Sequence, residues 1–219
     1  MTILFMSVNV MCFSNNLIKK PKIVVFTSKG GNGHMSTCAV LKDVLPECEI
    51  KLVHPIYDFF HNFIDGEEWY STFLKNGYIN SANFLIRYPG TAFFQFRYKS
   101  FEKRFTKFLQ EEKPDLLISV IPFVNYPSYA AAKKTNTPFM IITLDADIEN
   151  WLINMKKCRD HDFVMSVQTK TPLIENQVKK SKIPLSCIRE VGAPLRKDFF
   201  TPKNKEEIKK EWNIPSDKK

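Results

Sequence analysis

The sequence is poor in cysteine pairs, in glycine and in long apolar runs, and two of these shortages exclude a class of protein. Its five cysteines are odd in number and form no CxxC pair, so neither a disulfide framework nor a zinc site is indicated and we predict no metal ligands. The apolar start has no Lys or Arg before its hydrophobic part and is shorter than the roughly 20 residues that span a bilayer. We therefore expect no signal peptide, and we interpret residues 1–20 as a poorly ordered extension.

The charge balance indicates which partners suit the chain. With 32 Lys and Arg against 23 Asp and Glu, the formal net charge is +9. This excess favours an anionic partner such as a nucleotide, a nucleic acid or an acidic membrane surface, and charge alone does not choose among them. A hydrophobic content of 44% over 219 residues is sufficient for one large domain with a core. Unpaired cysteines fit a reducing cytoplasm.

Six short apolar runs rich in β-branched residues recur along the chain, with helix-like segments between them. Because these runs are almost continuously apolar, we expect helices on both faces of the sheet that they form. The pattern predicts a Rossmann-like α/β domain over residues 21–200, with a doubly wound and mostly parallel sheet. Ligands of such sheets bind at the carboxyl ends of the strands. The predicted strands are Lys22–Phe26, Glu49–Val53, Asp115–Val120, Pro138–Leu144, Phe163–Val167 and Cys187–Val191.

Four helices can be delimited from the sequence. Thr171 followed by Pro172 is a strong helix start, because Thr is a good N-cap and Pro suits the first helical position. That helix is expected to continue to Lys180. The other predicted helices are Met35–Leu45, Pro127–Thr135 and a basic segment at Lys205–Trp212.

Glycine is concentrated in one turn. Gly30, Gly31 and Gly33, three of the chain's seven glycines, follow the first predicted strand and lead into a helix. Such a turn gathers backbone N–H groups in a concave nest at the positive end of a helix dipole, which attracts anionic or hydroxyl-rich ligands. His34 closes the turn, where its imidazole would meet such a ligand. A tight turn without a ligand is the other interpretation.

Residues 57–108 hold 17 of the 29 aromatic side chains, interleaved with Lys and Arg. Aromatic rings that enter the acyl boundary beside cations that meet anionic headgroups suit a membrane interface. Ordinary helix packing explains the same composition, and Phe101, Phe105 and Phe108 have the i, i+4, i+7 spacing of core residues. No aromatic signature of an RNA-binding sheet is present, so we predict no nucleic-acid partner. The predicted membrane contacts are Phe59, Phe60, Phe63, Trp69, Phe93, Phe94 and Arg97.

Four blocks within residues 22–200 carry a resemblance to a known family. They are Ser28–His34, Lys113–Phe123, Pro138–Leu152 and Arg189–Phe200. With them, the chain resembles the N-terminal half of the monogalactosyldiacylglycerol synthase and processive diacylglycerol glucosyltransferase family, which are GT-B glycosyltransferases. The resemblance implies transfer of a hexose from a UDP-sugar to diacylglycerol or a related lipid, without a cofactor. It also implies a peripheral protein at the cytoplasmic face of a membrane, with the anionic membrane surface as a partner.

The same resemblance implies a domain boundary near the end of the sequence. Residues 201–219 are similar to the linker and the start of a C-terminal donor domain, which the sequence does not continue. A separate donor-domain polypeptide is then an expected partner. The identity of the hexose depends on that donor half and stays open.

Candidate site residues follow from the resemblance position by position. His34 is the candidate general base that takes the proton of the acceptor hydroxyl as it attacks the anomeric carbon with inversion, a task that suits imidazole near neutral pH. Asp145 is expected to orient either His34 or the acceptor, or it is a solvated loop carboxylate. Glu149 stands where the family has a histidine, so it receives no role. Substrate contacts are expected from Gly30, Gly31, Asn32, Gly33, Trp151 and Arg196.

Two other classes stay open at the level of sequence. One is a non-catalytic, lipid-binding relic of such an enzyme. The other, more remote, is a deviant P-loop ATPase, because Lys29–Ser36 imitates the turn of that class. His34 and Met35, however, stand where the P-loop needs a phosphate-binding lysine and a magnesium-binding hydroxyl.

Overall fold

Six parallel strands form the centre of the structure, a computed structural model that describes residues 19–28, 32–59, 72–201 and 204–215. All neighbouring strands pair in parallel, in the order β2-β1-β3-β4-β5-β6. The predicted doubly wound α/β fold is therefore confirmed. The strands are β1 (Lys22–Phe26), β2 (Glu49–Val53), β3 (Leu116–Ser119), β4 (Phe139–Ile142), β5 (Val164–Val167) and β6 (Ile188–Glu190).

The first two strands coincide with their predicted bounds, whereas the other four are shorter than their apolar runs. β5 is shorter only at its amino end, and the other three are shorter at both ends; at the carboxyl edge of the sheet, apolar residues continue beyond the assigned strands. Val120 and Ile121, for example, are buried although they lie in the connection after β3. Apolar character therefore identifies burial at this edge better than it identifies the last residue of a strand.

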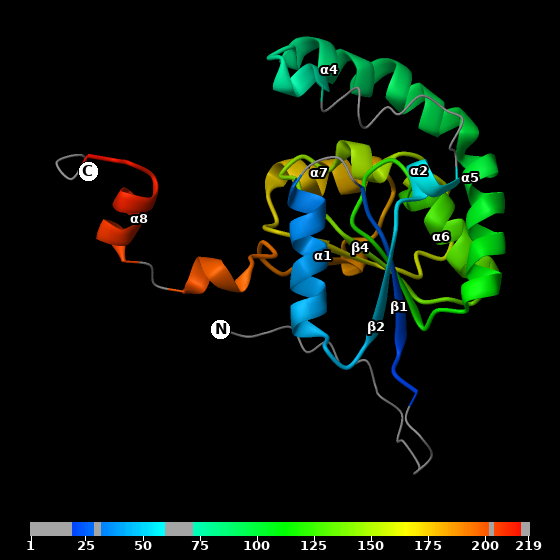
Figure 1. Cartoon of the computed structure of the whole chain (residues 1–219). Helices are drawn as coiled ribbons and strands as arrows, with labels where there is room; N and C mark the ends of the chain where they lie inside the picture. Colours follow the sequence, from blue (N-terminus) through cyan, green and yellow to red (C-terminus); the bar gives the residue numbers. More distant parts are fainter. Residues whose placement is uncertain (1–18, 29–31, 60–71, 202–203, 216–219) are drawn as a thin grey trace.

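Alternate residues of the central strands pack against helices on opposite faces of the sheet. Ile23 and Val25 of β1 belong to a cluster with Cys38 of α1. Val24 and Phe26 belong to a larger cluster that includes Phe105 of α5. Figure 1 shows α1 in front of the sheet, and α5 and α6 to its right. Burial on both faces explains why the strands lack polar alternation.

The remaining helices largely follow the predicted boundaries. Thr171 caps α7 through its side-chain oxygen, which accepts a hydrogen bond from the N–H of Ile174 at 3.3 Å, as expected of this N-cap. Two helices start earlier than predicted, at Asn32 and Asn125, because glycine and proline are tolerated in a first turn. The helices outside residues 55–112 are α1 (Asn32–Val44), α6 (Asn125–Lys134), α7 (Pro172–Lys180) and α8 (Lys205–Glu211), with short 3-10 turns η2 (Glu149–Leu152), η3 (Met155–Lys157), η4 (Leu185–Cys187) and η5 (Lys197–Phe200).

A bent helical arm precedes β3. It runs through α4 (Ile79–Leu85), a π-helical turn η1 (Ile86–Gly90) and α5 (Thr91–Glu112), and the short α2 (Pro55–Phe59) lies before it. Pro89 lacks an N–H and its ring crowds the preceding turn, which accounts for the bend. Glycine suits position 90, because a Cβ there would lie 3.0 Å from the carbonyl oxygen of Leu85, a tight contact. As a result, α4 lies above the carboxyl ends of the strands in Figure 1.

The far end of α5 is joined to the sheet by one carboxylate. Glu112 accepts hydrogen bonds from Lys22 Nζ at 2.6 Å and from Lys51 Nζ at 2.5 Å. These two ammonium groups hold the pKa of the Glu112 carboxyl below its usual range. The contact fixes the last turn of α5 against β1 and β2.

Candidate functional site

The strand order defines where a ligand of this sheet would bind. After β1 the chain crosses to β2 on one side, and β3 pairs with the other side of β1. The connections that leave the carboxyl ends of β1 and β3 therefore diverge, and a crevice at such a switch point is the usual ligand site of an open α/β sheet. The start of α1 and the loop Val120–Val124 before α6 lie at this point.

His34 lies in the first turn of α1 and is tied to the neighbouring loop. Its Nδ1 lies 2.5 Å from the carbonyl oxygen of Val120. A carbonyl oxygen only accepts, so Nδ1 carries the proton and donates it. In the neutral imidazole, Nε2 then keeps its lone pair and is the atom able to accept a proton from a ligand. The ring is half-buried, so it is held in place while part of it remains accessible.

Gly33 precedes this histidine and lies close to the next loop of the site. The nearest atom to a Cβ built at Gly33 is Cδ1 of Leu144, at 3.9 Å. The start of α1 therefore faces the chain just after β4. Gly30, Gly31 and the side chain of Asn32 lie outside what the structure describes, so their predicted contacts stay predictions.

Asp145 directly follows Leu144 at this edge, and it has a buried partner. Its Oδ2 accepts a hydrogen bond of 2.7 Å from the indole Nε1 of Trp151. Trp151 itself is 0% exposed and belongs to the core. This burial corrects the expectation that Trp151 contacts substrate, because a side chain without accessible surface meets no ligand. What the indole does contact is the candidate site carboxylate.

The expectation that Asp145 orients His34 also needs revision. The orienting position on the imidazole, Nδ1, is occupied by Val120 O. The sequence analysis expected Asp145 to orient His34 or the acceptor, or to be a solvated loop carboxylate. Of the first two roles, contact with the acceptor is the one compatible with this geometry.

The loop before α6 and the first residue of α6 contact the segment that contains Trp151, and the same loop contacts His34. The sequence analysis did not predict these contacts. The N–H of Phe123 donates to the carbonyl oxygen of Asn150 at 3.0 Å, and the buried amide of Asn125 donates to the carbonyl oxygen of Trp151 at 3.0 Å. Phe123 adopts φ 71°, a left-handed conformation that is uncommon outside glycine and is found at functional sites. No sequence motif reports these bonds, because three of the groups involved are backbone atoms.

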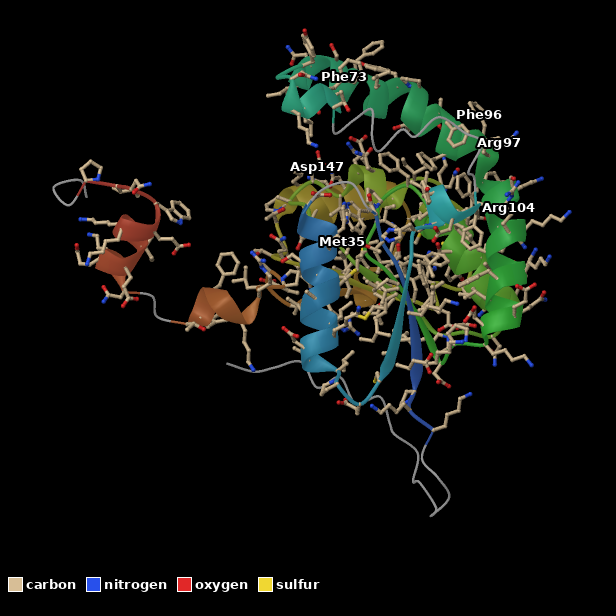
Figure 2. The ribbon with its side chains drawn as sticks, in the orientation of Figure 1. Met35, Phe73, Phe96, Arg97, Arg104 and Asp147 are labelled. Carbon is tan, nitrogen blue, oxygen red and sulfur yellow. The ribbon has the colours of Figure 1, made fainter. Side chains whose placement is uncertain are left out.

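One further carboxylate, Asp147, lies beside the site, and Arg196, a predicted substrate contact, has no described contact with it. Asp147 accepts from Gln177 Nε2 at 2.6 Å and from the N–H of Glu149 at 3.0 Å, which makes it a local cap. Figure 2 shows Asp147 and Met35 at the same end of the molecule, beneath the α4 arm. Arg196 is exposed and lies over the ring of Phe199 at 5.8 Å, and no described contact brings it to His34.

The predicted membrane contacts are distributed differently from the expectation. Phe59, Phe93 and Phe94 are partly buried and pack against the large core cluster, so the aromatic surface is formed by other residues. Phe94 stacks on Phe123 with ring centroids 5.0 Å apart, which joins the arm to the loop before α6. Phe101 and Phe105 are buried as predicted. Phe60, Phe63 and Trp69 lie outside the described residues.

Several apolar side chains of the arm are exposed. Phe96 is 79% exposed, and Figure 2 shows it projecting from α5 beside Arg97. We call this set the arm surface; its apolar members are Tyr78, Ile79, Phe84, Tyr88 and Phe96. Phe94 and Phe96 are two residues apart on α5, so they point to roughly opposite sides of that helix. The π-helical turn η1 changes the helical phase of the residues that precede α5, and no sequence pattern predicted this turn.

The described residues contain neither a candidate membrane-spanning helix nor a candidate metal site. None of the described helices combines the length and the apolar character needed to cross a bilayer. Likewise, His, Cys, Asp and Glu side chains do not gather in groups of three or more that could hold a metal ion anywhere in the described ranges.

Comparisons with known proteins point to one family. The family model described as monogalactosyldiacylglycerol (MGDG) synthase matches residues 33–188. The chain is 26% identical over 211 residues to the processive diacylglycerol beta-glucosyltransferases of Bacillus cytotoxicus and Bacillus cereus, and 25% identical to that of Bacillus thuringiensis. These matches cover 93% of this chain and 52% of each relative, so the chain spans about half the length of the curated relatives. No solved structure matches it.

Proposed function

Because the chain belongs to the monogalactosyldiacylglycerol synthase family, we propose that it is the acceptor-binding half of a glycosyltransferase that moves a hexose from a UDP-sugar to diacylglycerol. The curated relatives are named as processive diacylglycerol beta-glucosyltransferases, and the match to them extends over 93% of this chain. The donor half is supplied by the remainder of the polypeptide or by a separate chain. The observation that carries the proposal is the fixed geometry of His34 at the switch point of the sheet.

His34 acts as the general base in this proposal. Its Nδ1–H donates to Val120 O at 2.5 Å, so the lone pair of the neutral imidazole lies on Nε2. Nε2 takes the proton of the diacylglycerol hydroxyl while the hydroxyl oxygen forms a bond to the anomeric carbon. The bond from that carbon to the UDP oxygen breaks, UDP leaves with the bonding pair, and the configuration inverts. General-base assistance of this kind accelerates a reaction about 10²–10⁴-fold.

The arm surface supports the peripheral membrane association that a diacylglycerol acceptor requires. Diacylglycerol stays in the bilayer, so the site must reach the lipid surface. Exposed rings such as Phe84 and Phe96 suit the acyl boundary, and the cations of α5, including Arg97, suit anionic headgroups. In the view of Figure 1, α4 lies on the same side as the carboxyl ends of the strands. This arrangement favours a bilayer at the site end of the molecule, on the cytoplasmic side where the nucleotide sugar is made.

The two alternatives differ from this proposal in what they require. A P-loop ATPase needs a lysine directed at the phosphates from the position of His34, and the family match gives that class no support. A non-catalytic relic needs no base. A substitution at His34 separates it from an active enzyme.

The test is His34→Ala, with Met35→Ala as the matched control. Met35 is the next residue of the same helical turn and is 42% exposed, so its truncation leaves the proposed base in place. The native protein, with its donor-domain polypeptide if the halves are encoded separately, is assayed with UDP-glucose and UDP-galactose on vesicles that contain diacylglycerol.

We expect His34→Ala to lower the transfer rate at least about 10²-fold with vesicle binding unchanged. Met35→Ala should retain the wild-type rate. Equal rates for wild type and His34→Ala would refute the base, and the absence of transfer by the complete protein with either donor would refute the enzyme.

A further inference from the structure

The Asp145 carboxylate is held from below by a side chain that no ligand can reach. Trp151 is 0% exposed, and its single polar side-chain atom, Nε1, donates to Asp145 Oδ2 at 2.7 Å. Burying an indole N–H without a partner is costly, and here the partner is a charged group at the surface of the site. The bond is charge-assisted and therefore directional. It fixes the orientation of the carboxylate.

The tryptophan is fixed in turn by the loop that also positions His34. The buried side-chain amide of Asn125 donates to Trp151 O at 3.0 Å, and the N–H of Trp151 donates to Ile148 O at 2.9 Å. Val120, five residues before Asn125, provides the carbonyl oxygen that binds Nδ1 of His34. One connection thus sets the orientation of the imidazole and, through Trp151, that of the carboxylate.

The second oxygen of Asp145 remains for a ligand. A carboxylate accepts hydrogen bonds at both oxygens, and the described residues provide a partner for Oδ2 only. The side chain is exposed at the edge where Leu144 approaches Gly33 and the start of α1. Because the Nδ1–H of His34 donates to Val120 O, it does not donate to this carboxylate. The carboxylate oxygen therefore suits a hydroxyl donor.

We propose that Trp151 is a positioning residue that holds Asp145 so that its free oxygen accepts a hydrogen bond from a hydroxyl group of the acceptor lipid. The proposal rests on the acceptor function proposed above. It assigns the two residues different roles: Asp145 touches the substrate, and Trp151 acts only through Asp145.

The positioning step can be observed in the chain itself by the indole N–H signals of a ¹⁵N-labelled sample. The chain has three tryptophans, so Trp151→Phe identifies the Trp151 signal by its loss. Asp145→Asn keeps the shape of the side chain and removes its charge, and it should move the Trp151 signal more than any other indole signal. Asp147→Asn is the matched control, because Asp147 lies two residues away and binds Gln177 instead. If Asp145→Asn leaves the Trp151 signal in place, the proposal is overturned.

The hydroxyl step is tested with dioctanoylglycerol in phosphatidylcholine bicelles. Its binding should move the Trp151 signal in the wild type, and Asp145→Asn should weaken binding about 10-fold, the usual effect of losing one charge-assisted hydrogen bond. Trp151→Phe should weaken it similarly; should that variant fail to fold, Asp145→Asn carries the test alone.

Two results would contradict the hydroxyl role, and they have different meanings. Equal binding by wild type and Asp145→Asn overturns the hydroxyl role and leaves the acceptor function intact. No binding of dioctanoylglycerol by the wild type overturns the hydroxyl role together with the proposed function.

Discussion

The sheet and the helical arm bury their apolar residues by different rules. In β1, every residue from Ile23 to Phe26 is buried, since helices cover both faces of the sheet. In the arm, Phe105 is buried and Phe96 is exposed although both lie on α5. The central strand β1 therefore uses its apolar residues for the core. The arm divides its aromatic residues between the core and the exposed arm surface.

The largest expected effect tests the buried side of the arm. Phe105 lies 4.9 Å from Phe26 and 5.5 Å from Phe59 between ring centroids, so Phe105→Ala leaves a cavity between α5 and the sheet. We expect the free energy of unfolding to fall by about 3–5 kcal/mol in urea denaturation. Phe96→Ala, on the same helix, should change it by less than about 0.5 kcal/mol. Similar losses for the two variants would show that α5 has no distinct inner and outer side.

A second, smaller effect tests the exposed side. Replacing Phe84 and Phe96 by Ser removes two rings that are 60% and 79% exposed, which should lower the affinity for phosphatidylglycerol-containing vesicles about 10-fold or more. The melting temperature should stay unchanged. Vesicle co-sedimentation measures the affinity.

The control for this pair is Leu173→Ser on α7, where a side chain of similar exposure, 51%, lies outside the arm. If Leu173→Ser weakens vesicle binding as strongly as the double substitution, membrane affinity is a general property of the surface and not of the arm.

The smallest effect concerns the contact that holds the arm to the sheet. Glu112→Gln removes the charge that Lys22 and Lys51 bind, and should lower the melting temperature by about 1–3 °C at pH 7. Because the folded-state pKa of Glu112 is lowered, its stabilisation is present above the ordinary carboxyl pKa and is lost as the pH falls through the lowered value. The difference between wild type and variant should therefore disappear in acid.

Glu111→Gln provides the comparison for this measurement. Glu111 is the neighbouring residue, 65% exposed, with only Lys107 at 3.9 Å, so its substitution should have almost no effect at any pH. A loss at Glu111 equal to that at Glu112 would mean that net charge, and not the contact with the sheet, explains the result.

Sequence reasoning was reliable where one physical rule decides the outcome. The strand at Lys22–Phe26 and the N-cap at Thr171 were predicted at their observed positions, because continuous apolar character and capping chemistry are local properties. It was less informative where burial depends on helical phase and tertiary contacts. Phe59, Phe93 and Phe94 were predicted to contact a membrane; they are partly buried against the core, and their membrane contact stays a prediction.

The candidate site shows the same division. His34 was identified from its place after a glycine turn, and the switch point of the sheet lies there. The bond from His34 to Val120 O and the burial of Trp151 had no counterpart in the sequence, because a backbone carbonyl has no residue signature and a tryptophan suits both core and surface.

The sequence by itself determined the α/β class, the positions of the strands along the chain and the family. Each of these depends on local composition or on motifs that occur in a fixed order. Only the tertiary structure decided which nitrogen of His34 binds the carbonyl oxygen of Val120 and that the buried Trp151 donates to Asp145. The physical reason is that parallel strands bring together loops from distant parts of the chain, here at Val120, Asp145 and Trp151, and the hydrogen bonds between those loops exist only once the sheet has formed.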